Sequence, residues 1–352
     1  MNIAVLGNGQ LGAMMQQAGL RIGVEVQLLD IDAGQLASPD MIVTAEREHW
    51  PQNAFTTSLA QAPGWLNAKA FHHLADRIRQ KTFITELGLP TSPWRVFRTD
   101  MGQEGIHAQL GPDVFLKSPQ GGYDGRGQLR LKQATPAALP FPAWADQSLA
   151  EQAIAFDTEV SIIGARGRDG QMVFYRLTEN RHQDGVLAFS ISRPGAFEAL
   201  QAPAEDMLRT LMTALDYVGV MAVECFVVDG KLLINEIAPR VHNSGHWTQA
   251  AASISQFELH VRAVCGMPLP EPVQQGAAIM ANLLGVAYDQ AWLAHGAAQL
   301  HWYGKDYRPG RKMGHINLAS PDVRQLAQWL GEMTLPAELE ASRSWAIQRL
   351  AS

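Results

Sequence analysis

The strongest signal in this chain is the run Phe115-Leu116-Lys117-Ser118-Pro119-Gln120-Gly121-Gly122-Tyr123-Asp124-Gly125-Arg126-Gly127-Gln128. It predicts a strand that ends in lysine, a loop with four glycines and a second strand. Glycine lets a loop fold closely over polyphosphate and donate backbone N–H groups to it. Lys117 would neutralise phosphate charge, and Arg126 offers a planar fork of donors. Asp124 is an anion inside a phosphate loop, which favours a catalytic role; the alternative is a hairpin turn in which Asp124 caps its own backbone.

A second signal is a predicted hairpin over residues 220–237, which turns at Asp229-Gly230 and carries one glutamate on each strand. Acids within apolar strands need a partner, because an unpaired buried charge is costly. A regular two-residue loop would place Glu224 opposite Asn235 and send Glu236 to the other face. We predict a longer loop or a bulge instead, since two carboxylates on one face, with Asn235, form a hard oxygen site suited to magnesium held against phosphates. The alternative is that each acid pairs separately with a basic side chain.

The N-terminus carries the run Gly7-Asn8-Gly9-Gln10-Leu11-Gly12 between a short buried strand and a predicted helix. Backbone N–H groups at such a helix start can hold an anion, and Asp30 ends the second strand as a ribose-binding acid would. Alone, this pattern supports a nicotinamide oxidoreductase. Many doubly wound sheets, however, need glycine there only for tight turning and close packing. An intermediate interpretation is that backbone groups of Gln10 and Leu11 bind the phosphate or ribose of a different ligand.

The chain has 352 residues, more than one hydrophobic core usually serves, so we expect several packed domains. The fold class expected is a mixture of α/β and α+β. A doubly wound, Rossmann-like domain is predicted over 1–90, and it includes one helix over 68–87. A small lid with short strands follows over 91–152. A larger, mainly antiparallel domain follows over 153–352, and its last part, from about residue 267, is expected to bind the acceptor.

The composition restricts the class of partner. A formal net charge of -6 argues against a broad basic surface for nucleic acid or an anionic membrane, so any phosphate site must be local. Only Cys225 and Cys265 occur, too few for a disulfide framework and too widely spaced for a zinc site. The sequence shows no basic leader and no apolar run of membrane-spanning length. We therefore expect a reduced, cytoplasmic protein.

The order of these motifs resembles the ATP-grasp superfamily. It runs from a linker helix with Ala75-Asp76-Arg77, through Lys117 and its loop, to Glu151-Gln152, Glu224 and Asn235-Glu236. Within that superfamily, three runs look like the N5-carboxyaminoimidazole ribonucleotide synthetases of purine biosynthesis. They are residues 7–12, residues 121–127 and Asn235-Glu236-Ile237-Ala238-Pro239-Arg240-Val241-His242-Asn243-Ser244-Gly245-His246. The resemblance continues through Gly304 to His315 and so covers nearly the whole chain.

The resemblance implies an ATP-grasp fold and an ATP site with magnesium. Residues 151–154 would read adenine through backbone groups, Glu159 would hold the ribose hydroxyls, and Lys117 would sit on the phosphates. Glu224 and Glu236 would bind one or two magnesium ions. The implied ATP residues are Arg77, Lys117, Gly122, Tyr123, Asp124, Gly125, Arg126, Gly127, Gln128, Glu151, Gln152, Ala153, Ile154, Glu159, His182, Asn235 and Glu236.

The implied reaction carboxylates 5-aminoimidazole ribonucleotide. Bicarbonate would attack the γ-phosphate to give carboxyphosphate and ADP, and carbon dioxide would then reach the exocyclic amine. Asp124 would orient the amine or accept its proton beside Tyr123, while Arg126 and Arg240 would stabilise bicarbonate or carboxyphosphate. The implied catalytic residues are Tyr123, Asp124, Arg126, Arg240 and Lys305. A lid that closes would protect carboxyphosphate from water.

The acceptor site is expected around the basic cluster Lys305-Asp306-Tyr307-Arg308-Pro309-Gly310-Arg311-Lys312, for which the alternative is a solvated loop. The implied acceptor residues are Gln10, Leu11, Glu46, Asn243, Lys305, Arg311 and Lys312. The spacing of His242 and His246 suggests a metal, but on a loop beside acids hydrogen bonding is favoured over zinc. The resemblance also suggests a homodimer.

Three rival classes remain open. Another ATP-grasp enzyme, such as a formate-using phosphoribosyl glycinamide ligase or a biotin carboxylase, would share the nucleotide residues and differ in the acceptor residues. A nicotinamide oxidoreductase would use residues 7–12 and leave the other motifs unexplained. A nucleotide-binding regulatory protein without catalysis would not need both acids, Lys117 and the basic cluster. The full set of motifs favours the aminoimidazole enzyme.

Overall fold

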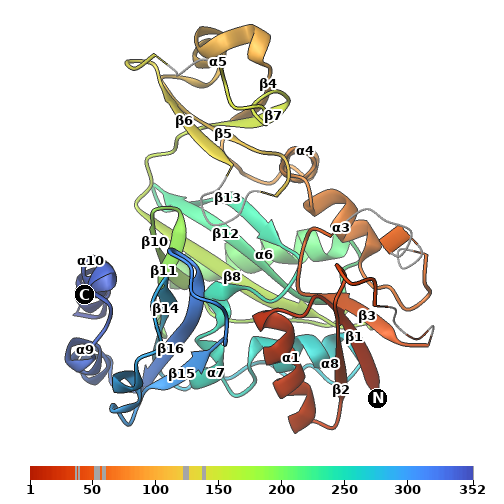
Figure 1. Cartoon of the computed structure of the whole chain (residues 1–352), viewed down its shortest axis with the longest axis vertical. Helices are drawn as coiled ribbons and strands as arrows, with labels where there is room; N and C mark the ends of the chain where they lie inside the picture. The colour runs from red at the N-terminus through yellow and green to blue at the C-terminus, as the bar shows by residue number, and fades with distance from the viewer. Residues whose placement is uncertain are drawn as a thin grey trace.

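The computed structural model describes residues 1–35, 38, 40–50, 56–57, 61–121, 127–136 and 140–351, and three sheets organise this part of the chain (Figure 1). The first sheet is parallel, with the order β2-β1-β3. Its strands are β1 (Asn2–Leu6), β2 (Glu25–Leu29) and β3 (Ile42–Ala45), and helix α1 (Gln10–Arg21) connects the first two. Ile3 and Val5 of β1 are fully buried, as a central parallel strand requires. The predicted doubly wound opening is confirmed.

The single helix predicted over 68–87 is wrong, because the chain forms α3 (Ala68–Leu74) and α4 (Arg77–Glu86). The break lies at Asp76, whose carboxylate accepts the N–H groups of Ile78 at 2.9 Å and Arg79 at 3.1 Å. Such a cap satisfies backbone donors that the helix itself leaves open. The new helix start also lets the N–H of Arg77 donate to Pro119 O at 2.9 Å, just beyond the strand that ends in Lys117.

The second sheet forms a small body that stands away from the rest of the molecule (Figure 1). Its order is β4-β7-β5-β6, all antiparallel. Phe97, Ile106, Val114 and Leu116 form its core. The elements are β4 (Trp94–Phe97), η1 (Thr99–Met101), α5 (Gly102–Leu110), β5 (Asp113–Lys117), β6 (Gln128–Lys132) and β7 (Ser148–Gln152).

The third sheet has nine strands, all paired antiparallel, in the order β13-β12-β8-β10-β11-β14-β16-β15, with β9 beside β8. The strands are β8 (Thr158–Arg166), β9 (Met172–Phe174), β10 (Thr178–Gln183), β11 (Val186–Ser192), β12 (Gly219–Val228), β13 (Lys231–Ala238), β14 (Ala277–Leu284), β15 (Gln299–Trp302) and β16 (Lys312–Ser320). The expectation of a mainly antiparallel sheet is confirmed. The domain boundaries at residues 90 and 152 stay predictions.

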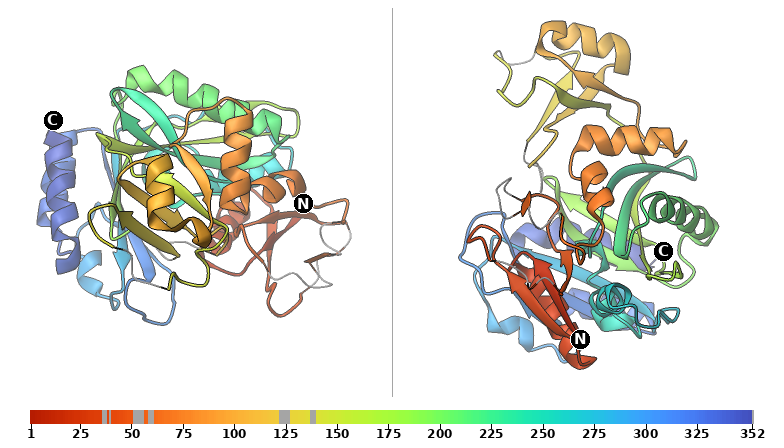
Figure 2. Two further views of the ribbon diagram at one scale, coloured as in Figure 1. Left: turned by 90° about the horizontal axis from the view of Figure 1, so that it is seen from above. Right: turned by 90° about the vertical axis from the view of Figure 1, so that its right-hand side faces the viewer.

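Helices cover this sheet at several places. Helix α8 lies beside α1 and joins the first sheet to the third, while α9 and α10 lie on the opposite side of the molecule (Figure 2). The elements are α6 (Glu198–Ala214), η2 (Asn243–Gly245), α7 (Thr248–Ala251), α8 (Gln256–Val264), η3 (Gln290–Leu293), α9 (Val323–Glu332), η4 (Ala337–Leu339) and α10 (Glu340–Ala351). Within the described residues, no helix is both long and apolar enough to cross a membrane.

The register of the β12–β13 hairpin decides where the two glutamates lie. The loop has two residues, Asp229 and Gly230, both with positive φ, and Val228 pairs with Lys231. A bulge follows, because Cys225 pairs with Ile234 while Glu224 pairs with Glu236. Asn235 is the extra residue, so both carboxylates lie on one face. The predicted bulge is confirmed.

The outer edge of β13 is paired with the linker that follows α4. The N–H of Ile234 donates to Pro90 O at 2.8 Å, and Thr91 forms a parallel bridge with Ile234. Three residues further along β13, the buried Gln80 of α4 accepts from Ile237 N at 2.9 Å and donates to Ile237 O at 3.0 Å. These bonds hold the strand position next to Glu236 in place.

Candidate active site

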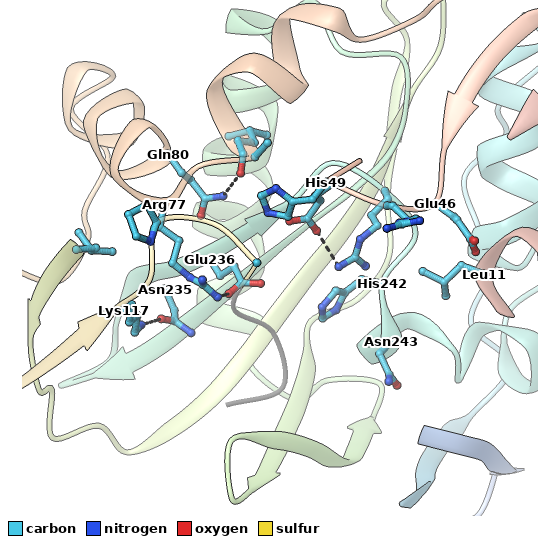
Figure 3. A pocket seen from close by; sticks show the side chains of 18 of the residues that line it. Leu11, Glu46, His49, Arg77, Gln80, Lys117, Asn235, Glu236, His242 and Asn243 are labelled. Carbon is cyan, nitrogen blue, oxygen red and sulfur yellow. Dashed lines mark hydrogen bonds and ion pairs between the residues drawn. The ribbon is translucent and has the colours of Figure 1, made fainter. Parts of the chain in front are cut away.

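Two adjoining cavities of about 510 and 500 Å³ lie where the three sheets meet. The first cavity reaches the first sheet through Gln10, Leu11 and Glu46, and Figure 3 shows it between β3, α4 and the end of β13. The second cavity reaches the small second sheet through Phe115 and Gln128. The residues that line both are Arg77, Lys117, Glu151, Asn235, Glu236, Arg240, His242, Asn243 and Lys312. Because the cavities share these residues, a molecule bound in one cavity can contact a molecule bound in the other.

The second cavity gathers most of the predicted ATP residues. Gly127 does not line it, and Gly122, Tyr123, Asp124, Gly125 and Arg126 lie outside the described residues. Phe156 and Phe226, which were not predicted from the sequence, also line it; their rings are stacked with centroids 4.7 Å apart. The predicted residues that do line it are Arg77, Lys117, Gln128, Glu151, Gln152, Ala153, Ile154, Glu159, His182, Asn235 and Glu236.

Lys117 belongs to a buried ion triad. Its Nζ lies 2.6 Å from Glu151 Oε2, and Nζ of Lys81 lies 2.7 Å from Glu151 Oε1. The side chains of Lys81 and Glu151 are each 3% exposed. Burial raises the pKa of Glu151, but the two lysines outweigh it and lower that pKa to about 2. Glu151 therefore stays charged and holds Lys117 at the cavity surface, where Lys117 also contacts Asn235 Oδ1 at 3.4 Å.

Glu224 lies in a cluster of acids and histidines in the second cavity. His182 Nδ1 contacts Glu159 Oε2 at 2.5 Å, and its Nε2 lies 3.9 Å from Glu224 Oε1. Burial lowers the pKa of His182, yet the bond to Glu159 and the charge of Glu224 raise it overall to about 9. Burial, assisted by Glu236, raises the pKa of Glu224 to about 7. Two facing carboxylates that repel each other are suited to a divalent cation.

The donor set fits magnesium only with help from a ligand. In the described part of the chain, no group of three or more histidine, cysteine or acidic side chains could hold a metal ion. Glu224, Glu236 and Asn235 supply the hard oxygen atoms that magnesium prefers, but too few for its octahedral shell. Phosphate oxygens and water would complete the shell, as they do at other magnesium sites that bind nucleotides.

The glycine loop in the first sheet already holds an anion, the carboxylate of Glu46. Glu46 Oε1 accepts the N–H of Gly9, and Oε2 accepts the N–H of Gly12 at 2.6 Å. A Cβ atom on Gly9 would lie 2.8 Å from Glu46 Oε1, so the close approach requires glycine. The donors that a dinucleotide phosphate would use are therefore occupied. Glu46 lines the first cavity as predicted, but both of its oxygens are already bound.

Arg240 is held between the two cavities by Glu48, whose Oε1 lies 2.7 Å from Arg240 Nη2. Burial raises the pKa of Glu48, while Arg240 lowers it. Neither Glu48 nor Lys81 was predicted from the sequence. A signal for Glu48 existed in the run Glu46-Arg47-Glu48-His49, because it follows the carboxyl end of a parallel strand, where ligands gather.

The predicted acceptor residues are only partly brought together. Gln10, Leu11, Glu46, Asn243 and Lys312 line the first cavity. Lys305 and Arg311 line neither cavity: Lys305 lies over the ring of Tyr303, with Nζ 5.2 Å from the ring centroid, and Arg311 Nη1 donates to Asp306 O at 3.0 Å. Only Lys312, the first residue of β16, points into the site.

The loop after β13 determines which ring nitrogen of His242 carries the proton. The backbone N–H of Ser244 donates to His242 Nδ1 at 3.3 Å, and the Ser244 hydroxyl lies 2.9 Å from the same nitrogen. A nitrogen that accepts a backbone N–H has no proton of its own, so in the neutral ring the proton is on Nε2. Burial, Arg240 and Lys312 hold the pKa of His242 well below its usual value. His242 therefore presents a neutral donor to both cavities.

Comparison with known proteins agrees with this arrangement. Residues 82–257 match the ATP-grasp domain, and residues 278–328 match the phosphoribosylaminoimidazole carboxylase C-terminal domain. The N5-carboxyaminoimidazole ribonucleotide synthase of Escherichia coli is 47% identical over 348 residues, 98% of each chain. The crystal structure of the synthetase from Thermus thermophilus is 38% identical, covers 97% of this chain and 98% of its own, and superposes with a TM-score of 0.84.

A further solved structure holds two ligands. The N5-carboxyaminoimidazole synthase of Aspergillus clavatus, in complex with ADP and 5-aminoimidazole ribonucleotide, is 25% identical, covers 99% of this chain and 98% of its own, and has a TM-score of 0.79. The identity to the bacterial proteins extends over nearly the full length of each chain, and both family matches fall in the expected order. The chain therefore belongs to the N5-carboxyaminoimidazole ribonucleotide synthase family of ATP-grasp ligases.

Proposed function

We propose that this protein uses ATP to carboxylate 5-aminoimidazole ribonucleotide with bicarbonate in purine biosynthesis, giving N5-carboxyaminoimidazole ribonucleotide, ADP and phosphate. One observation carries the proposal: two cavities share a lining that holds cations, Glu236 and a neutral histidine donor, and Glu224 faces Glu236 from the second cavity. A reaction that first activates bicarbonate and then transfers its carbon needs such a connected pair of sites. Family membership supports the same activity.

ATP would occupy the second cavity. The N–H groups of Gln152 and Ala153 already donate to Pro93 O and Asp113 O at 2.9 Å each. The N–H of Ile154 has no partner among the described residues, so it would donate to adenine. The stacked rings of Phe156 and Phe226 would contact the base, and Glu159 would accept the ribose hydroxyls.

The phosphates would extend from there toward the common lining. Lys117, held by Glu151, and Arg77, whose Nη1 donates to Ser118 O at 3.0 Å, would neutralise their charge. Glu224 and Glu236 would hold magnesium, which when bound neutralises charge that develops on the phosphate oxygens. This arrangement presents the γ-phosphate to the boundary between the two cavities.

Bicarbonate would bind beside Arg240 and His242. One of its oxygens attacks the γ-phosphorus, the bond to ADP breaks, and carboxyphosphate forms; the guanidinium and the Nε2–H of His242 stabilise the oxygens that gain charge. Carboxyphosphate then breaks into carbon dioxide and phosphate. The exocyclic amine attacks carbon dioxide and releases one proton, for which Asp124 stays the predicted acceptor. Tyr123 and Arg126 stay predicted catalytic residues in the same loop.

The acceptor would occupy the first cavity, with Lys312 near its phosphate and Asn243, held by Asn282 at 3.0 Å, near its ribose. Lys305 and Arg311 remain predicted phosphate ligands that would have to approach this cavity with the segment before β16. A cytoplasmic location and a homodimer also stay predictions.

The test measures ATP hydrolysis by the purified protein with magnesium and bicarbonate, with and without 5-aminoimidazole ribonucleotide, together with the carboxylated product. We expect stimulation by the ribonucleotide with stoichiometric product, and loss of hydrolysis with EDTA. Stimulation by glycinamide ribonucleotide with formate would instead support the formate-using rival. Absence of ATP turnover with every acceptor would refute the ligase assignment.

A further inference from the structure

His246 lines the first cavity, yet no role in the reaction proposed above requires it. His246 is 1% exposed. The centroid of its ring lies 5.3 Å from that of Phe257 and 4.7 Å from that of His315. The backbone is also held, because Asn317 Nδ2 donates to His246 O at 3.0 Å. A polar ring enclosed in this way must place its proton on one particular nitrogen.

The buried Gln256 determines which nitrogen that is. The backbone N–H of His242 donates to Gln256 Oε1 at 2.9 Å, and a backbone N–H can only donate. The amide nitrogen of Gln256 is thereby identified; it donates to His242 O at 2.6 Å and faces His246 Nδ1 at 2.9 Å. Since that nitrogen can only donate, His246 Nδ1 accepts. The proton of the neutral His246 ring is therefore on Nε2.

The other side of the ring faces the first cavity. His246 Nε2 has no hydrogen-bond partner in the described part of the chain. The described side-chain atoms that are buried and lack a partner do not include this nitrogen, so Nε2 is accessible from the cavity. The neighbouring His315 cannot bind it, because Tyr303 Oη at 2.6 Å and Gln249 Oε1 at 3.1 Å occupy both of its ring nitrogens. A donor that opens into a cavity and has no protein partner indicates a ligand atom.

We propose that His246 is a further substrate-binding residue, whose Nε2–H donates to an uncharged lone-pair acceptor of the ribonucleotide, a ring nitrogen or a ribose oxygen, and that Gln256 is the residue that positions it. This inference rests on the proposed function of the first cavity. Burial, with His301 and Lys312, lowers the pKa of His246 well below its usual value, so the ring is neutral. A neutral donor binds the acceptor without supplying a proton to the amine that must attack.

The first experiment reads the tautomer without any turnover. The protein is labelled with ¹⁵N-histidine, and the signals of His246 are assigned by their loss in H246Q. We expect Nε2 to carry the proton and Nδ1 to be unprotonated, and the Nε2–H proton resonance to shift when 5-aminoimidazole ribonucleotide is added. Gln256→Glu replaces the donor by a carboxylate, so the proton should move to Nδ1.

The second experiment compares two variants at one position. His246→Gln keeps an N–H donor near the place of Nε2, whereas His246→Phe keeps the ring volume without a donor. We expect H246F to raise KM for 5-aminoimidazole ribonucleotide about 3- to 10-fold, the contribution of one neutral hydrogen bond, and to leave KM for ATP unchanged. H246Q should stay within roughly twofold of the wild type.

The outcomes separate this inference from the proposed function. A proton on His246 Nδ1 in the wild type, or an unchanged KM for the ribonucleotide in a folded H246F, overturns the inference alone. Equal rises in KM for ATP and for the ribonucleotide overturn it as well, because they indicate a general structural role. Wild-type protein that carboxylates no 5-aminoimidazole ribonucleotide refutes the proposed function, and this inference with it.

Discussion

Replacement of Lys81 by methionine tests whether the buried triad holds Lys117 in place. The pKa of Glu151 falls from 4.5 to about 2, which corresponds to about 3 kcal/mol of stability at neutral pH. Burial also lowers the pKa of Lys81, which shows that the buried ammonium costs free energy. Removing Lys81 recovers this cost and so offsets part of the lost stability. We therefore expect K81M to lower the free energy of unfolding by about 2 kcal/mol at pH 7, slightly less than breaking a buried pair usually costs.

The assay is urea unfolding followed by circular dichroism, with K231M as the matched control, because Lys231 lies exposed at the start of β13. Removal of both partners, in K81M with Glu151→Met, should cost no more than K81M alone, since Lys117 is 17% exposed and can be hydrated from the cavity. KM for ATP should rise both in K81M and in the double variant, whereas the double variant should lose no further stability. The two variants therefore separate the triad's role in stability from its role at the phosphates.

The pH dependence gives a second check. Glu151 has a lowered pKa in the folded protein, so its stabilisation is present above pH 4.5 and is lost as the pH falls through about 2. The difference between wild type and K81M should therefore shrink as the pH falls from about 4.5 to about 2. Equal stability of K81M and K231M at pH 7, or a difference that does not change with acid, would refute the reasoning.

Three further predictions concern other parts of the site. Glu46→Ala should cost about 2 kcal/mol in urea unfolding, because it leaves the N–H groups of the glycine loop without their acceptor, and Glu46→Gln should cost less; equal costs would contradict this. The raised pKa of His182 contributes stability that is complete below pH 6.5 and is lost as the pH rises through about 9. His182→Asn should therefore not show the fall in unfolding free energy that the wild type shows over this pH range. Parallel pH profiles of the two proteins would contradict this. Glu224→Gln should reduce kcat/KM at least about 10-fold. It should also raise the urea midpoint at pH 8, because it removes the buried charge of a carboxylate whose pKa is raised to about 7. A lower midpoint would count against this.

The strand pattern and the hairpin could be predicted from the sequence because their causes are local. Two acids in apolar strands must share a face to share a cation, and that requirement alone indicated the bulge at Asn235. The helix break at Asp76 was missed, since apolar spacing continues through it and a capping side chain is not distinguishable from an exposed one. Strands β10 and β11 and helix α6 were also not predicted.

The candidate site could be predicted only where the motif itself holds the residue. Lys81 and Glu48 were missed because their partners, Glu151 and Arg240, are far away along the chain and become neighbours only through the sheets. Charge density in the sequence predicted the basic cluster before β16, but it does not say which side chains turn inward. Of the three chosen there, only Lys312 lines a cavity.

The linker paired to β13 also bears on self-association. An edge strand with free backbone groups is a template on which a second chain can add, and β13 is one edge of the nine-stranded sheet. Thr91 and Pro90 already occupy that edge at Ile234. Pro90 and Pro93 have no N–H to offer a further strand, so sheet growth stops there. The segment that leads to the small sheet thus also protects the strand of Glu236 from pairing with a strand of another folded molecule.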